Sequence, residues 1–116
     1  MKLNLECVKA VLEMVELNAN TSKPFEVNKD NYKNYHHIKD FDYKDVEYTL
    51  NKLIECGYVQ DMQYLQLGFN IIDLSYEGHS ALKELRDPKN LQMILKNIAT
   101  GIQTTSALAS LAKLFS

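Results

Sequence analysis

The segment IIDLSYEGH at residues 71–79 changes from a strand-like pattern to a helix-start signal within a few residues. Its first part, IIDL, is rich in the branched apolar residues that favour a strand. Ser75 is a good helix N-cap, and Glu77 falls in the first helical turn, where the positive end of the helix dipole favours a carboxylate. The segment therefore predicts the last strand of a hairpin that leads directly into a helix.

The residues on either side complete the hairpin and the helix. After Gly57, two runs rich in aromatic and branched apolar side chains, 58–65 and 69–74, flank a turn expected around Gly68. The helix after the hairpin has three apolar side chains on one face: Ala81, Leu82 and Leu85. This pattern predicts a helix that packs against a core.

Before the hairpin, two segments carry apolar residues at helical spacing. Asn4 is placed to cap a first helix that runs to about Leu17. Asp42 is placed to cap a later helix, which Gly57 stops. The apolar stripe of this later helix consists of Tyr43, Val46, Leu50, Leu53 and Ile54.

The chain between these two helices is less regular. A polar turn and Pro24 end the first helix, and Phe25 and Val27 favour a short strand. Between Asp30 and Asp40 the pattern is weak, but three side chains would share one face if a short second helix formed there. These side chains are Tyr32, Tyr35 and His36.

Composition limits the class of protein. The chain has 116 residues, 46% of them hydrophobic, which suits a single compact unit with one modest core. A formal net charge of -2 gives no overall attraction to phosphate, so nucleic-acid binding would need a local basic face. Cys7 and Cys56 lie in apolar helical patterns, which favours two reduced core thiols over a disulfide or a metal site.

The order of helix, short strand, weak helix, strong helix, hairpin and helix is that of winged-helix domains, whose third helix is the usual reader of the DNA major groove. The sequence LSYEGH at residues 74–79 is similar to the L-T-x-x-G step that follows the wing in repressors of the multiple-antibiotic-resistance type. We therefore predict an α+β fold, mainly α, with a winged helix-turn-helix and a two-stranded wing in residues 1–87. Residues 88–116 are expected to form a C-terminal helical extension.

Two further motifs strengthen the resemblance. The opening MKLNLECV, the step IECGYV at residues 54–59 and the later LSYEGH together resemble a family of small proteins of unknown function from phages and prophages of Gram-positive bacteria and their relatives. The resemblance extends from the first helix to about Arg86. It implies a winged helix in a phage or mobile-element context, and it supplies no catalytic residues.

The outer face of the predicted third helix is a candidate surface for contact with another macromolecule. Five residues form this candidate face: Lys44, Glu47, Tyr48, Asn51 and Lys52. Asn51 can read adenine, and Lys44 or Lys52 can contact phosphate or guanine, with Lys33 and Lys39 as further phosphate contacts. Carboxylates on the same face would repel a polyanion, so protein contact or plain solvation explains the face equally well.

The predicted wing is poorly equipped to hold phosphate. No lysine or arginine occurs between Lys52 and Lys83, but the same stretch contains the acidic residues Glu55, Asp61 and Asp73. Phosphate contacts supply most of the sequence-independent affinity for DNA, and a wing that makes them normally carries a cation. This pattern favours a protein partner over DNA.

The C-terminal extension is a candidate oligomer interface. Its apolar residues at helical spacing are Leu91, Leu95, Ile98 and Ile102. They offer more apolar surface than a small core can cover, so the extension either packs on a second copy or folds back on the domain. A homodimer formed by these helices is the expectation, and binding to a membrane surface ranks third because few basic residues accompany them.

Enzyme motifs are absent from the sequence, which has no G-x-S-x-G, no phosphate loop and no H-E-x-x-H. His36 and His37 diverge on a helix and are expected to be a surface pair, and His79 is expected to make a structural hydrogen bond. We therefore expect no catalytic residue, metal, cofactor or small-molecule substrate. The start of the chain lacks the apolar run of a signal peptide, which favours a cytoplasmic protein of a bacterial host.

Two functions remain open. The leading hypothesis is a regulatory or host-interacting adaptor that acts by protein contacts, and it follows from the uncharged-to-acidic wing and the acidic third helix. The alternative is a DNA-binding transcriptional regulator, and it follows from the fold. No apolar run is long and uninterrupted enough to span a bilayer, so we expect no membrane insertion.

Overall fold

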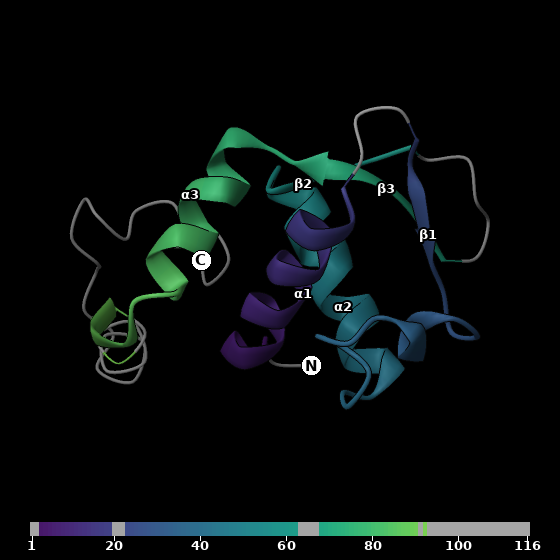
Figure 1. The fold of residues 1–116 in the computed structure, drawn as a ribbon, viewed down its shortest axis with the longest axis horizontal. Helices are drawn as coiled ribbons and strands as arrows, with labels where there is room; N and C mark the ends of the chain where they lie inside the picture. Colours follow the sequence, from purple (N-terminus) through teal and green to yellow (C-terminus); the bar gives the residue numbers. More distant parts are fainter. Residues whose placement is uncertain (1–2, 20–22, 63–67, 91, 93–116) are drawn as a thin grey trace.

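The computed structural model describes residues 3–19, 23–62, 68–90 and 92. They form an α+β fold in which helices predominate and one small antiparallel sheet has three strands (Figure 1). The elements in chain order are α1 (Leu5–Asn18), β1 (Phe25–Val27), the 3-10 helix η1 (Tyr32–Asn34), α2 (Tyr43–Glu55), β2 (Val59–Asp61), β3 (Phe69–Leu74) and α3 (Tyr76–Leu85). The backbone of residues 88–90 is helical, as the proline at position 88 suggests.

The sheet has the strand order β1-β3-β2, and both pairings are antiparallel. The predicted hairpin is confirmed as the β2–β3 pair, in which Val59 lies opposite Leu74. The short strand predicted at Phe25 and Val27 is confirmed as β1, which adds a third strand to the sheet and places Phe25 opposite Ile71. Strand β2 ends at Asp61, and the predicted turn before Gly68 lies mostly outside the described residues.

The core is built around α1. This helix contacts α2, α3 and β3, and Figure 1 shows it in front of α2 with α3 beside it. The Cys7 thiol is completely buried and accepts a hydrogen bond from Thr49 Oγ1 at 3.4 Å, so it is a core thiol as expected. Burial raises the pKa of this thiol, which keeps it protonated. Cys56 is only half-buried and packs at the edge of the core.

Where a short second helix is predicted, the structure has only a short 3-10 helix. Residues 30–40 form turns, and their one regular element is the three-residue η1. The ring of the buried Tyr32 packs on that of Tyr43, with 5.3 Å between the ring centroids, whereas the Tyr35 ring packs on Phe25, with 5.9 Å between centroids. Tyr32 and Tyr35 therefore do not share one face of a helix. The Asn31 side chain also binds backbone groups of β1 and the following turn, in competition with helical hydrogen bonds.

The junction between β3 and α3 depends on three side-chain and backbone contacts. The Ser75 hydroxyl accepts a hydrogen bond from Gly78 N at 3.1 Å and donates one to the carbonyl of Gly57. Gly57 has a φ of 82°, a left-handed conformation that suits glycine after a helix. Gly78 lies so close to Tyr58 that an added Cβ would be 2.1 Å from the Tyr58 carbonyl oxygen. The serine cap of α3 is therefore confirmed, and it ties α3 to the end of α2.

Of the two other predicted N-caps, only the one that begins α1 makes capping hydrogen bonds through its side chain. The Asn4 side chain accepts hydrogen bonds from Glu6 N at 2.9 Å and Cys7 N at 3.3 Å, which confirms it as the cap of α1. Asp42 occupies the N-cap position of α2, but its side chain makes no capping hydrogen bond. Its contribution to α2 is therefore limited to the favourable interaction of its charge with the helix dipole.

Candidate macromolecule-contact surface

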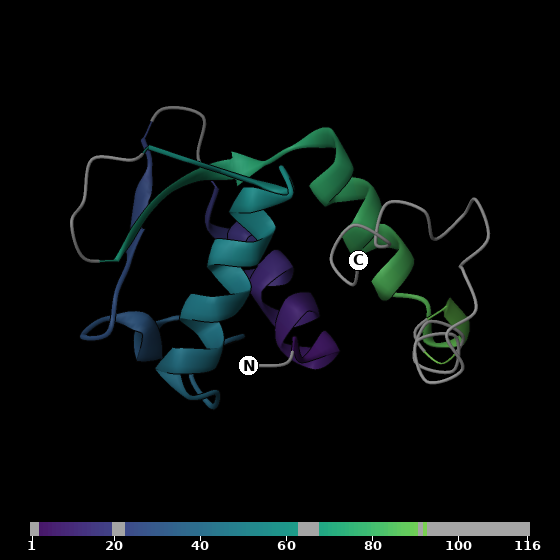
Figure 2. The same ribbon diagram turned by 180° about the vertical axis from the view of Figure 1, so that it is seen from behind.

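Helix α2 presents the five residues of the candidate face on the side opposite the core. Its buried side is made of Val46, Thr49, Leu50 and Leu53. On the opposite side, Lys44, Glu47 and Asn51 are exposed, and Tyr48 and Lys52 are half-buried. In Figure 2, α2 lies in front of α1, and no described element crosses the side of α2 that faces the reader. The geometry thus places the five predicted residues together on an uncovered surface.

The charges on this surface are not neutralised by neighbours. Two lysines, Lys44 and Lys52, alternate along α2 with two glutamates, Glu47 and Glu55. Within the described part of the chain, none of the four takes part in an ion pair. Each charge is therefore available to a partner without the loss of an existing ion pair.

Lys33 and Lys39, the predicted phosphate contacts, are exposed in the turns between β1 and α2. Figures 1 and 2 show these turns beside the N-terminal end of α2. The same turns carry exposed carboxylates at Asp30, Asp40 and Asp42. The lysines of these turns are therefore interrupted by carboxylates and do not form a continuous basic surface with α2.

The opposite end of α2 is acidic. Glu55 is exposed in the last turn of α2. The Glu77 carboxylate is also close to this end of the helix, because a Cβ added to Gly57 would lie 3.9 Å from Glu77 Oε2. Asp61 and Asp73 continue this charge along the sheet, and no lysine or arginine occurs in the sequence from Leu53 to Leu82. The exposed ring of Tyr76 adds a large apolar group at the start of α3.

A cluster of charged side chains that the sequence prediction missed connects α1 to α3 and β3. Arg86 donates a hydrogen bond to Glu16 Oε1 at 2.6 Å. His79 Nδ1 lies 3.9 Å from the other oxygen of Glu16, and its Nε2 lies 3.9 Å from Asp73 Oδ1. Both distances exceed the range of a hydrogen bond, so His79 does not make its expected structural hydrogen bond to either carboxylate. Glu16 and Arg86 are far apart in sequence, so no local pattern indicates that they meet.

The two adjacent histidines have different surroundings. His36 is exposed, and His37 is half-buried with its Nε2 atom 3.5 Å from Glu13 Oε2. The surface pair of the sequence prediction is thus correct for His36, whereas His37 links the turns before α2 to α1. No group of three metal-ligand side chains occurs among the described residues.

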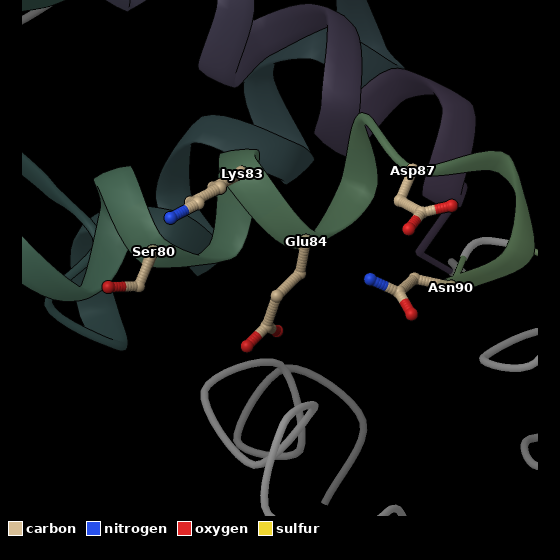
Figure 3. Close-up of a pocket in the computed structure, with 5 residues that line it drawn as sticks. All are labelled: Ser80, Lys83, Glu84, Asp87 and Asn90. Carbon is tan, nitrogen blue, oxygen red and sulfur yellow. The ribbon is translucent and has the colours of Figure 1, made fainter.

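A shallow hollow lies along α3 and the residues that follow it (Figure 3). It has a volume of about 380 Å³ and is lined by Ser80, Lys83, Glu84, Asp87 and Asn90. All five side chains are polar or charged, unlike the mainly apolar lining of most small-molecule sites. The sequence prediction named none of these residues.

Two further predictions concern the C-terminal extension and membrane insertion. Leu91, Leu95, Ile98 and Ile102, the predicted oligomer interface, fall outside the described residues. Among the residues that are described, no helix is long and apolar enough to cross a membrane.

The sequence was also compared with known proteins. One family, described as hypothetical protein (DUF2513), matches residues 2–104 of the chain. No curated protein and no solved structure matches it. The family match agrees with the expected membership of a family of unknown function and covers far more than half of the sequence. The chain therefore belongs to the family of hypothetical proteins described as DUF2513.

Proposed function

We propose that this chain is a non-enzymatic winged-helix protein of phage or prophage type that acts as a regulatory or host-interacting adaptor through protein contacts of α2. The winged-helix reading is supported by the element order and by a sheet in which β1 pairs with the second strand of the hairpin. The phage or prophage context rests on the sequence motifs at the start of the chain and around Ser75.

The single observation that carries the adaptor role is the mixed, unpaired charge on the exposed side of α2. A surface that reads DNA gains most of its affinity from cations at phosphates, and each nearby carboxylate opposes that gain. On α2, Glu47 and Glu55 offset Lys44 and Lys52. A protein surface with alternating charge can complement all four groups, whereas a phosphate backbone complements only the lysines.

The alternative function is that of a DNA-binding transcriptional regulator. It is supported by the exposure of Lys44 and Asn51 on α2 and of Lys33 and Lys39 in the adjacent turns. In this arrangement Lys44, Asn51 and Lys52 would read bases, while Lys33 and Lys39 would contact the backbone.

A titration of labelled duplex DNA with the full chain at several salt concentrations separates the two functions. For an adaptor, we expect only weak binding at physiological salt, with no change in the double variant Lys44→Ala, Lys52→Ala. The control is Lys29→Ala, Lys89→Ala, which removes the same charge from exposed positions outside α2. Sub-micromolar binding that weakens steeply with salt and is lost only in the α2 variant would instead establish the DNA-binding function.

A further inference from the structure

The exposed side of α2 has a central row of four residues with opposite charges at its two ends and two polar residues between them. We call this row the α2 strip, and it consists of Lys44, Tyr48, Asn51 and Glu55. The members are four, three and four residues apart, so they follow one line along a helix, opposite the buried side. One end of the α2 strip is a cation and the other end is a carboxylate.

The members of the α2 strip are also placed symmetrically. Lys44 and Glu55 are equally far from the midpoint of the strip, which falls between Thr49 and Leu50, and Tyr48 and Asn51 are equally far from it as well. When two copies of a helix pair in antiparallel orientation about a two-fold axis, residues at equal distances from that axis face each other. An axis at the midpoint would therefore set each Lys44 against Glu55 of the second copy, and each Tyr48 against Asn51.

From this symmetry we infer that the α2 strip is a homodimer contact, in which a second copy of the chain docks antiparallel on α2. The inference rests on the proposed protein-contact role of α2 and names its partner. Charge complementarity favours a second copy of the chain as the partner, because one two-fold axis pairs the charges at both ends of the strip. The exposed Lys44 and Glu55 side chains have no ion-pair partner among the described residues of their own chain.

The surroundings of α2 leave room for this contact. No described element crosses the exposed side of α2 in Figure 2. Tyr48 lies near the middle of the strip, where an aromatic ring contributes most to an interface. A helix of 13 residues is only about 20 Å long, so the contact is small and the dimer should be weak and sensitive to salt.

Two single charge reversals give a direct test of the pairing. In Lys44→Glu both ends of the α2 strip become acidic, and in Glu55→Lys both become basic, so each variant repels its own copy. A mixture of the two variants restores both ion pairs in a heterodimer. We expect each variant alone to self-associate at least about tenfold more weakly than the native chain, and the equimolar mixture to regain the native strength.

The measurement is sedimentation equilibrium of the full chain at low and moderate salt. Both reversals suit the α2 dipole, because a carboxylate is favoured in the first turn and a cation in the last. The helix should therefore persist, and circular dichroism verifies this. Lys29→Glu and Asp40→Lys are matched controls at exposed positions outside α2, and both should self-associate like the native chain.

Three outcomes would overturn the inference: a native chain that stays monomeric at millimolar concentration, single variants that associate as well as the native chain, or a mixture that stays as weak as its components. None of these outcomes would by itself refute the adaptor role, which can use a different protein partner. The adaptor role fails separately, if the DNA titration gives tight binding that depends on Lys44 and Lys52.

Discussion

Gly78 shows how closely the backbone of α3 approaches the residue before β2. An added Cβ would lie 2.1 Å from the carbonyl oxygen of Tyr58, and backbone atoms cannot move aside as a flexible side chain can. We therefore predict that Gly78→Ala lowers the free energy of unfolding by more than about 2 kcal/mol, although alanine normally stabilises a helix by about 1 kcal/mol over glycine. Urea denaturation measures the change. Ser80→Ala in the same helix is the control, and equal midpoints for the two variants would contradict the close contact.

Tyr58 is completely buried, and its hydroxyl has no hydrogen-bond partner among the residues that the structure describes. Burial, followed by the charges of Cys56, Glu77 and Glu84, raises the pKa of Tyr58 from 10.0 to about 12. Because the pKa is higher in the folded state, the associated stability is complete below pH 10 and is lost as the pH rises towards 12.

The substitution Tyr58→Phe follows from this environment. It removes an unsatisfied polar group, so we expect the free energy of unfolding at neutral pH to rise by about 1 kcal/mol. The alkaline loss of stability should also become smaller. Urea midpoints measured across the alkaline range test both effects, and a variant less stable than the native chain at neutral pH would show that the hydroxyl does have a partner.

At the scale of single elements, the caps of α2 and α3 should differ in importance. The Ser75 side chain bonds to Gly78 N and to the Gly57 carbonyl, so Ser75→Ala should cost about 1 to 2 kcal/mol of stability. Ser75→Thr keeps the hydroxyl and should cost much less. Asp42→Ala should have a smaller effect than Ser75→Ala, since Asp42 makes no capping hydrogen bond. Thermal unfolding of the three variants measures the order, and a larger loss in Asp42→Ala would contradict it.

The elements that the sequence predicted well are those with signals close together in the chain. Helices α1 and α3 begin at side chains that cap them, and α2 ends just before a glycine with positive φ. The helix predicted between Asp30 and Asp40 is reduced to the short η1, because Tyr32 and Ile38 are buried by contacts that only the folded chain provides. The pairing of β1 with β3 joins Phe25 to Ile71, and no local pattern specifies such a distant partner.

For the molecule as a whole, packing around α1 should contribute more stability than the charged side chains that connect α1 to α3. Leu12 is completely buried in α1, so Leu12→Ala should cost about 2 to 5 kcal/mol. The Glu16–Arg86 pair is short but more than a third exposed, and Arg86→Ala should cost less than about 1 kcal/mol. Urea denaturation compares the two, and a larger cost for Arg86→Ala would show that the ion pair dominates.

The candidate surface could be predicted in part because helical periodicity separates the buried and exposed sides of α2. Lys44, Glu47 and Asn51 follow directly from that spacing. That α2 makes no ion pair with the described residues could not be predicted, because it depends on where the side chains of other elements lie. The predicted interface in the C-terminal extension remains a prediction, since its four residues lie outside the described ranges.

The central claim is that the exposed side of α2 meets protein and not DNA. The most direct test records amide spectra of the isotope-labelled full chain by nuclear magnetic resonance, first at increasing protein concentration and then with added duplex DNA. We predict concentration-dependent shifts that centre on Lys44, Tyr48, Asn51 and Glu55, with no shifts at these residues on addition of DNA at physiological salt. Shifts of the same residues that appear only with DNA would contradict the claim.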